Sequence, residues 1–219
     1  MIVALLPAYN EEHRVRGVVE SLLPLLDRVV VIDDASEDCT AREADRAGAF
    51  VLRHKINRGQ GAALQTGHEY AKKIGAEYAL HFDADGQFDP ADIPGALAYI
   101  RKQRADVLFG SRFLKESSCQ IPWLKRNILL PLAKHIDRLS GAVPLSDSHN
   151  GFRILSEKAL GRIIISQDRM AHATEIPVLV RRYNLSYVEY PVHVHYKEYG
   201  QGFGSGFEIL KDLILGRFV

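Results

Sequence analysis

Asp83 and Asp85 form a pair of carboxylates that is spaced to bind a metal ion. They stand two residues apart, directly after an apolar segment that predicts a buried strand, and Gln87 follows them. Two carboxylates at this spacing can converge on Mg²⁺ or Mn²⁺, which prefer oxygen ligands and complete their shell with phosphate oxygens. Gln87 can add an amide oxygen. Such a metal would neutralise the charge that builds on a departing diphosphate.

This segment also fits two other interpretations, a turn and a calcium loop. Asp-x-Asp-Gly also occurs in ordinary turns, and on this segment alone the turn stays open. The same pattern opens some calcium loops, but an EF-hand needs a bidentate Glu at its twelfth position. Counting from Asp83, that position is Pro94, which excludes the EF-hand.

A second acidic pair, Asp33 and Asp34, ends another apolar segment. Carboxylates at a strand end can accept hydrogen bonds from a base N–H or from ribose hydroxyls. Ser36 or Asp38 is expected to cap the next helix. Because Asp33 and Asp34 precede that cap, capping does not explain both of them.

Asn57, Gly59 and Gly61 lie in a loop before a predicted helix. Glycines at a helix start let backbone N–H groups approach an anion. The spacing matches neither a P-loop nor a complete GxGxxG motif. Tight packing of the chain at the start of the helix explains these glycines equally well.

Further along the chain, Arg112 follows Gly110-Ser111 at a strand end and can pair bidentately with a phosphate. A surface salt bridge is the alternative for a lone arginine. Asp147 is a candidate base, and Arg153 is a second candidate for a phosphate contact. His149, between them, is more often structural than catalytic.

The first half of the chain alternates apolar strand patterns with helix patterns. Strands are predicted at 2–6, 29–32, 50–53, 78–82 and 107–110. The first helix is expected to run to about Leu26 with Asn10 as its N-cap, and the second from the cap at Ser36 or Asp38 to about Ala47. Two further helices are predicted over 59–74 and 90–103. Gly48 is expected to end the second helix. This rhythm predicts an α/β protein with a doubly wound, mostly parallel sheet in a single domain. Ligands of such sheets bind at the carboxyl ends of the strands, where the polar segments named above fall.

The second half is less regular. Helices are predicted at 123–139, 156–165, 173–183 and 207–218, and 185–194 is an edge strand because it alternates and contains Pro191. Basic residues and Trp123 give the first of these helices a composition that suits a membrane surface, although an ordinary amphipathic helix on the sheet is the alternative. The segment 200–206 is rich in glycine.

Composition narrows the function classes. The 219 residues include 28 basic and 27 acidic side chains, which argues against a bulk nucleic-acid binder. Cys39 and Cys119 are too few for a disulfide scaffold and favour reduced thiols in a cytoplasmic protein. The apolar N-terminus lacks a basic n-region and predicts a strand rather than a signal peptide. No run of about 18 apolar residues predicts a transmembrane helix.

Five motifs together resemble the family 2 inverting glycosyltransferases, which have the GT-A fold. These motifs occur in the family's order and spacing: Pro7-Ala8-Tyr9-Asn10-Glu11, Asp33-Asp34-x-Ser36-x-Asp38-x-Thr40, Asn57-x-Gly59-x-Gly61, Asp83-x-Asp85 and Gly110-Ser111-Arg112. The resemblance covers roughly residues 1–155. Within the family, the Asp83 to Gln87 motif and the run from Asp147 to Arg153 look like polyprenyl-phosphate sugar synthases of the dolichyl-phosphate mannose synthase type.

The resemblance implies a site and its ligands. Residues 1–112 would bind a GDP- or UDP-linked sugar, and residues 113–219 would bind the acceptor, a polyprenyl phosphate. It implies a Mg²⁺ or Mn²⁺ ion on Asp83, Asp85 and Gln87. Acceptor or donor phosphates would bind to Arg112, Arg126 and Arg153. The implied contacts with the nucleotide sugar are Pro7, Ala8, Tyr9, Glu11, Asp33, Asp34, Asn57, Gly59, Gly61, Asp83 and Ala84. Asp85, Asp147, Arg112 and Arg153 would be the catalytic set. The expected location is cytoplasmic, with peripheral association with the cytoplasmic face of the membrane, and a membrane-anchored partner or a second copy is compatible with it.

The sequence departs from the subgroup in places. Asn150 stands where Ser or Cys usually precedes Gly-Phe-Arg, and the C-terminal membrane helices of many relatives are not expected here. The Gln-x-x-Arg-Trp motif of processive polysaccharide synthases is missing, which favours transfer of a single sugar.

The sequence leaves other functions open. A phosphate acceptor needs no strong base, whereas a hydroxyl acceptor in cell-wall or polysaccharide synthesis would need Asp147 or Glu175. A nucleotidyltransferase would show a glycine-rich basic loop in place of Pro7 to Glu11. A non-catalytic nucleotide-sugar-binding partner subunit would bind the donor without turnover.

Overall fold

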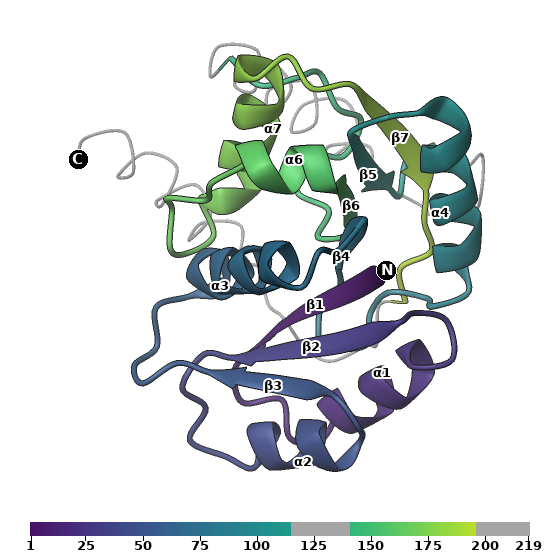
Figure 1. Ribbon diagram of the computed structural model, residues 1–219. Coiled ribbons are helices and arrows are strands. Elements are labelled where there is room, and N and C mark those ends of the chain that lie inside the picture. The colour runs from purple at the N-terminus through teal and green to yellow at the C-terminus, as the bar shows by residue number, and fades with distance from the viewer. Residues whose placement is uncertain (115–140, 196–219) are drawn as a thin grey trace, which may run out of the picture.

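The computed structural model describes residues 1–114 and 141–195, and its strands form one seven-stranded sheet in the order β3-β2-β1-β4-β6-β5-β7 (Figure 1). The strands are β1 Ile2–Ala8, β2 Arg28–Asp33, β3 Phe50–Arg53, β4 Tyr78–His81, β5 Val107–Ser111, β6 Arg153–Ser156 and β7 Tyr187–Pro191. The helices are α1 Val15–Leu22, α2 Thr40–Arg46, α3 Gln60–Lys73, α4 Asp92–Gln103, α6 Glu157–Arg162 and α7 His172–Arg182.

The sheet is mostly parallel, as the sequence predicts, with one exception. β1 pairs in parallel with β2 and β4, β2 with β3, and β5 with β7. β6 lies between β4 and β5 and runs antiparallel to both. No sequence pattern predicts β6, because its four residues begin with a charged arginine and show no period of their own. The edge position predicted for the strand containing Pro191 is confirmed by β7.

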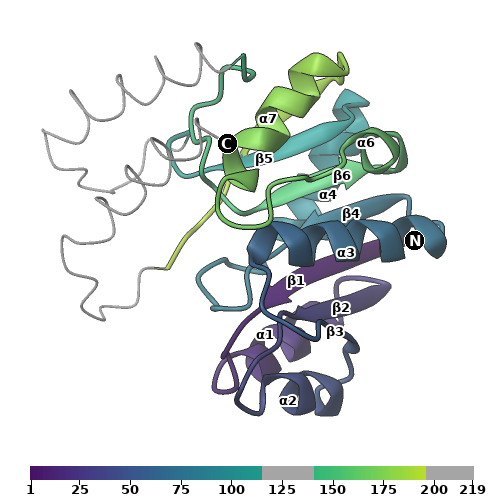
Figure 2. The ribbon, with the colours of Figure 1, turned by 90° about the vertical axis from the view of Figure 1, so that its left-hand side faces the viewer.

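Two apolar cores hold helices on opposite faces of the sheet, because successive residues of a strand point to opposite faces. On β1, Leu6 belongs to the core that α1, α2 and α4 cover, and Leu5 to the core under α3, α6 and α7. All four side chains from Val3 to Leu6 are fully buried. Figure 2 shows α3 lying along the central strands, where it packs mainly on β1 and β2. This sandwich fixes the directions in which the strand ends point.

The first helix is shorter than predicted. α1 begins at Val15, so Asn10 is not its N-cap. Asn10 takes a left-handed φ of 56°, and its side chain accepts a hydrogen bond from the Glu37 amide while Ser36 Oγ accepts one from the Asn10 amide. These bonds join the loop after β1 to the loop after β2. The competing tertiary partners explain why the local capping pattern failed.

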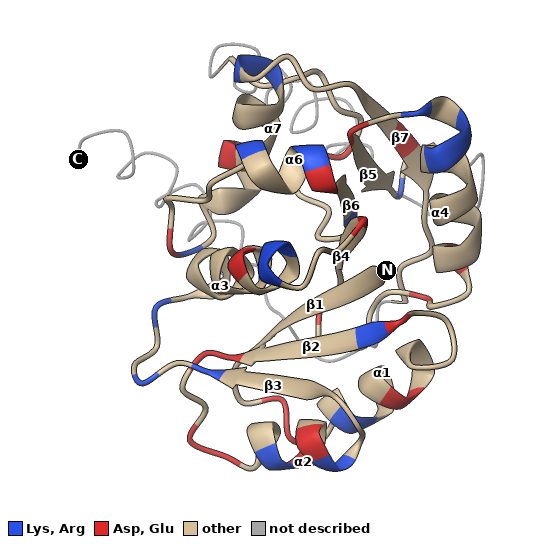
Figure 3. Ribbon diagram, in the orientation of Figure 1, with Lys and Arg blue, Asp and Glu red and all other residues tan. Residues whose placement is uncertain are grey.

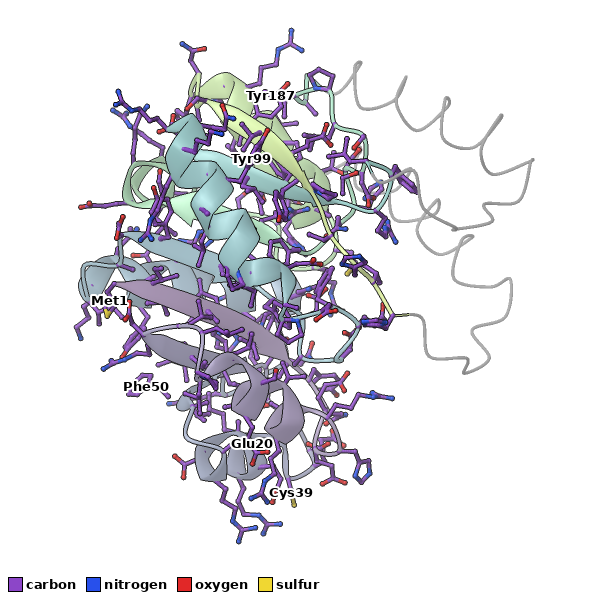
Figure 4. All side chains as sticks on the ribbon, turned by 90° about the vertical axis from the view of Figure 1, so that its right-hand side faces the viewer. Met1, Glu20, Cys39, Phe50, Tyr99 and Tyr187 are labelled. Carbon is purple, nitrogen blue, oxygen red and sulfur yellow. The ribbon has the colours of Figure 1, made fainter. Side chains whose placement is uncertain are left out.

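The end of α2 follows the sequence prediction, and its start does not. Gly48 has a φ of 96° just after α2, as expected for a helix terminator. The N-cap is Cys39, which makes no side-chain cap bond, instead of Ser36 or Asp38, although Asp38 accepts a hydrogen bond from the Thr40 amide. Cys39, labelled in Figure 4, is a free thiol at the same helix start.

Several predictions concern parts of the chain outside the described residues. They are the helices at 123–139 and 207–218, the glycine-rich segment 200–206, Cys119 and Arg126. Within the described part, no helix combines the length and apolar composition that crossing a membrane requires.

Candidate functional site

The polar segments picked out by the sequence meet at the carboxyl edge of the sheet. Ala8 ends β1 and Asp33 ends β2 in paired register, and Asp83 follows β4, the other neighbour of β1. Figure 3 shows an acidic segment at the end of β2 with the basic end of β3 beside it, where Arg53 Nε lies 2.9 Å from Asp33 Oδ2. The topology therefore brings together residues that are far apart in the chain.

Asp83 is held from two sides. Gln60 Nε2 at the start of α3 donates a 2.9 Å hydrogen bond to Asp83 Oδ1. A Cβ placed on Gly151 would lie 2.4 Å from Asp83 Oδ2, so the backbone of Gly151 packs directly on this carboxylate. Burial, followed by the negative charge of Asp85, raises the pKa of Asp83 from 3.8 to about 6. A cation beside the two carboxylates would remove this repulsion.

Asp85 closes the loop that begins at Asp83. Its Oδ1 accepts a hydrogen bond from the backbone amide of Gln87, and Gln87 is exposed to solvent. A cavity of about 340 Å³ opens beside Asp85, between this loop and the start of α1. Arg14 lines the same cavity, and its charge interacts with Asp85.

The donor set fits part of a hard-cation site. The carboxylates of Asp83 and Asp85 and the amide of Gln87 offer the oxygen ligands that Mg²⁺ and Mn²⁺ prefer. Across residues 1–114 and 141–195, no three His, Cys, Asp or Glu side chains are grouped so that they could hold a metal by themselves. The remaining ligands would have to be phosphate oxygens and water, as is usual for Mg²⁺.

Asp34 is an anchor for the loop before α3. Its Oδ1 lies 2.7 Å from His54 Nδ1, and its Oδ2 accepts a 2.6 Å hydrogen bond from the Gly59 amide. The Arg58 amide also donates to Asp34. Asp33 is fully buried, and its Oδ1 accepts a bond from the Ser36 amide. Both acids therefore shape loops at the expected nucleotide edge.

Gly59 and Gly61 pack against the segment 167–169. A Cβ on Gly61 would lie 1.9 Å from the Gln167 carbonyl oxygen, and one on Gly59 would lie 2.7 Å from the Asp168 carbonyl oxygen. That second carbonyl accepts a hydrogen bond from the Ala62 amide in the first turn of α3. Close packing therefore explains the two glycines. The Asp168 carbonyl accepts the bond from a backbone amide at the start of α3, where the sequence also allowed an anion. Asn57 is exposed in the same loop.

The residues expected from the first motif line the end of β1. Pro7 and Ala8 are paired with Ile32 and Asp33 of β2. Tyr9 is 45% exposed immediately after the strand and offers an aromatic face at the ligand edge. Glu11 accepts a 2.8 Å hydrogen bond from Arg14 Nη1. Ala84 is buried between the two acids of the metal motif.

Arg112 and Asp147 form a bidentate ion pair. Arg112 Nε donates to Asp147 Oδ2 and Nη2 donates to Oδ1, both at 2.7 Å, and the Arg112 amide donates to Oδ2 at 3.1 Å. Asp147 is 5% exposed and also accepts from Asn150 Nδ2. Asn150 Oδ1 in turn accepts from the Phe152 amide, which gives this departure from the subgroup pattern a role in shaping the loop.

Glu175, the other base considered, is also engaged. Its carboxylate accepts hydrogen bonds from the Ser166 amide and hydroxyl and from the Gln167 amide. These bonds hold the segment that packs on Gly61. Both carboxylates considered as general bases are thus bound to the protein's own donors.

Arg153 lies beneath the site and does not line it. The residue is 1% exposed, and its Nη2 donates to the carbonyls of Ser148 and Ala173 at 3.3 Å each. Burial lowers its pKa to about 10, against the opposing charges of Asp83 and Asp147. The guanidinium of Arg153 is therefore enclosed by the protein in this structure, and a phosphate contact for it stays a prediction.

Gln60, His54 and Arg14 lie at this edge although no sequence motif predicts a role for their side chains. Gln60 lies between the two motif glycines, and its contact with Asp83 follows from α3 packing beside β4. His54 links Asp34 to Thr66, and Arg14 lies beside Asp85. Since these are tertiary contacts across different elements, no local spacing signals them.

Comparison with known proteins identifies the family. The model of "Glycosyl transferase family 2" matches residues 4–164. An uncharacterised protein of Methanocaldococcus jannaschii, MJ1222, is 32% identical, covering 98% of this chain and 91% of that protein. The UDP-N-acetylglucosamine–dolichyl-phosphate N-acetylglucosaminyltransferase of Methanococcus voltae is 29% identical, covering 98% of this chain and 95% of that protein.

Solved structures confirm the fold. The glucosyl-3-phosphoglycerate synthase of Mycobacterium tuberculosis, in complex with Mn²⁺, UDP-glucose and phosphoglyceric acid, superposes with a TM-score of 0.67 at 19% identity. The match covers 99% of this chain and 79% of that chain. The sheet is therefore of the GT-A type, and this chain belongs to glycosyl transferase family 2 and is a glycosyltransferase.

Proposed function

We propose that the protein transfers a single sugar from a nucleotide-diphosphate sugar to a polyprenyl phosphate, with inversion at the anomeric carbon. The donor site would use the end of β1, at Pro7, Ala8, Tyr9 and Glu11, and the acidic end of β2. Support for the acceptor comes from the Methanococcus voltae relative, whose name states a dolichyl-phosphate acceptor. The donor would be UDP- or GDP-linked, and both fit an acidic base site.

Asp83 and Asp85, with Gln87, would hold Mg²⁺ or Mn²⁺ in this proposal. The metal, when bound, would stabilise the leaving nucleotide diphosphate. The raised pKa of Asp83 beside Asp85 supports this assignment, because two close carboxylates gain from a shared cation. The M. tuberculosis structure with Mn²⁺ and UDP-glucose supports divalent metal use in a protein of the same fold.

The hydrogen bonds of the two candidate bases are the observation that favours a phosphate acceptor over a hydroxyl acceptor. Asp147 is committed to Arg112, and Glu175 to the backbone and hydroxyl donors of Ser166 and Gln167. A hydroxyl acceptor would require one of them to take a proton. A phosphate monoester already carries a charge of about −1.5 to −2 at pH 7 and needs no base. The observed pairing therefore favours the phosphate.

The acceptor would approach Arg112, which can pair with phosphate oxygens, and Arg126 would contribute a second cation. Arg153 would stabilise the site through its buried charge. Residues 1–112 would form the donor half and 113–219 the acceptor half. A polyprenyl acceptor would bring the enzyme to the cytoplasmic face of a membrane as a peripheral protein, alone or with an anchored partner or second copy.

A donor screen tests the proposal first. Thermal unfolding is followed with UDP- and GDP-sugars and Mn²⁺ or Mg²⁺, with and without EDTA. The expected result is stabilisation by one donor that EDTA removes. Transfer is then measured to polyprenyl phosphate and to the matching polyprenol.

Each outcome of the two assays has a distinct meaning. Transfer to the phosphate and not to the alcohol supports the proposal. Transfer to the alcohol would point to hydroxyl chemistry. Donor binding without transfer to either would point to a binding subunit, and no donor binding would reject the donor site.

A further inference from the structure

A hydrogen-bonded clamp on β7 fixes the loop that carries Asp147. Glu189 Oε1 accepts a 2.7 Å bond from the Ser146 amide and a 2.6 Å bond from the Ser146 hydroxyl. Glu189 lies opposite Phe109 in the parallel pairing of β7 with β5. One carboxylate oxygen thus holds both donors of the residue immediately before Asp147.

The clamp continues to the end of β5. The hydroxyl oxygens of Ser111 and Ser146 are 2.6 Å apart, and Ser111 Oγ accepts from the Phe113 amide. Because the Ser146 hydroxyl donates to Glu189, its oxygen can accept a hydrogen bond from the Ser111 hydroxyl, so both hydroxyl groups have an acceptor. Arg112, between Ser111 and Phe113, is therefore held on its backbone side by the same network.

Asp147 holds the other side of Arg112 through two side-chain bonds and one amide bond. The segment 141–150 has no helix or strand, so bonds from neighbouring elements must define its position. The orientation of the Arg112 guanidinium consequently depends on where β7 places Ser146 and Asp147.

We infer that Glu189 is a positioning residue that fixes the Ser146–Asp147 segment and thereby aims Arg112 at the acceptor. The acceptor phosphate as the ligand of Arg112 rests on the proposed function; the mechanical link from Glu189 to Arg112 does not. Glu189 touches neither the metal motif nor the donor edge in the described contacts. Its loss should affect acceptor use and leave donor binding intact.

The far end of the same strands provides a matched control. The Ser186 amide and hydroxyl both donate to Asp106 Oδ2 at 2.9 Å, just before β7 and β5 begin. This clamp also joins a serine to one carboxylate oxygen, but it lies at the amino end of the strands. A purely structural role for Glu189 predicts that Asp106→Ala and Glu189→Ala have similar consequences.

The kinetic test compares Glu189→Ala, Glu189→Gln, Ser146→Ala and Asp106→Ala. We expect Glu189→Ala to lower kcat/KM for the acceptor on the order of 10²-fold, the usual effect of a small misplacement of a positioning group. The donor Kd should stay unchanged. Glu189→Gln keeps an oxygen that accepts both Ser146 bonds and should restore most activity, and Ser146→Ala should fall between. Asp106→Ala should lower thermal stability without changing acceptor kcat/KM.

Hydrogen exchange of the full chain tests the link without requiring turnover. Glu189→Ala should speed exchange at the amides of Ser146, Asn150 and Arg112, while Asp106→Ala should leave them unchanged. Unchanged exchange there, or equal acceptor defects in Glu189→Ala and Asp106→Ala, would overturn the inference. A wild-type protein that transfers to no acceptor would defeat the proposed function alone, and the exchange data would still decide the role of Glu189.

Discussion

Gly151 lies in direct contact with the carboxylate of Asp83: a Cβ on Gly151 would stand 2.4 Å from Oδ2 and 3.1 Å from Cγ of Asp83. Real Cβ atoms do not approach oxygen this closely, so any larger residue must displace the carboxylate. The turn before β6 therefore shapes the metal motif after β4, which lies far away in the sequence.

Gly151→Ala should weaken Mn²⁺ binding by about 10- to 100-fold, the range seen when a metal ligand loses its support. Isothermal titration in the presence of donor nucleotide measures this change. Gly161→Ala is the matched control, because a Cβ at Gly161 in α6 meets nothing within 4 Å. Equal metal affinity in the two variants would show that the contact does not position Asp83.

Asp85→Ala should abolish metal-dependent turnover, with a loss of at least about 10²-fold, because charge on the leaving diphosphate would lose its stabilisation. Initial rates are measured over a Mn²⁺ series. Glu20→Ala, an exposed position on α1 outside the site, serves as the control. Turnover by Asp85→Ala with an unchanged metal requirement would remove Asp85 from the metal site.

Metal affinity should depend on pH through Asp83. Burial and Asp85 raise its pKa to about 6, so protons compete with the metal below that pH, and affinity should fall about tenfold per pH unit. In the metal-free protein, the stability of the fold changes with pH in the opposite direction to the metal affinity. The raised pKa gives stability below the unfolded value of 3.8, which is lost as pH rises through about 6.

Titrations with Mn²⁺ between about pH 5 and about pH 7.5, a range that brackets the pKa of Asp83, test how the metal affinity depends on pH. Asp83→Asn should bind weakly with a flatter profile. A wild-type affinity that stays constant from pH 5 to about 7 would contradict the raised pKa of Asp83.

The buried His68–His81 pair should make the fold sensitive to mild acid. The two Nε2 atoms lie 2.7 Å apart, and both residues are fully or almost fully buried. Burial lowers the pKa of His68 from 6.5 to about 4, and burial with the neighbouring His68 lowers that of His81 well below 6.5. The unfolded chain therefore takes up protons first as pH falls.

The stability contributed by neutral His68 is present above pH 6.5 and is lost as pH falls toward about 4. The slope is about 1.4 kcal/mol per pH unit for each such histidine. Denaturant unfolding at several pH values should show a shallower slope for His68→Gln, which keeps a hydrogen-bonding group against His81. His149→Gln, at an exposed position, should leave the slope unchanged. Identical slopes in all three proteins would refute the assignment.

Much of the fold could be predicted because strands and helices here have strong local signals. β1 and β2 are rich in Val, Ile and Leu, and Gly48 and Pro191 mark a helix end and an edge strand. β6 was missed because a four-residue strand starting with Arg153 gains its stability from partners on both sides. The start of α1 was misplaced because Asn10 bonds to the loop after β2 instead of capping the helix.

The site shows the same division. The Asp83–Asp85 pair and the strand-end motifs were visible as spacing, and parallel topology required them to share one edge. The burial of Arg153 was not predictable, since it depends on how the preceding loop, at Ser148, and α7, at Ala173, fold around the guanidinium. The same holds for Gln60, whose contact with Asp83 depends on how α3 packs against the sheet.

Local sequence patterns are enough to predict most of the strand ends and the chemistry of the residues there, because periodicity and turn residues act over a few positions. Which of these groups contact each other depends on the folded chain. In the folded chain, Gly151 packs against Asp83 and Asp147 forms an ion pair with Arg112. Glu189 accepts hydrogen bonds from Ser146. Those contacts join separate elements through packing, and packing depends on the whole core rather than on any local pattern.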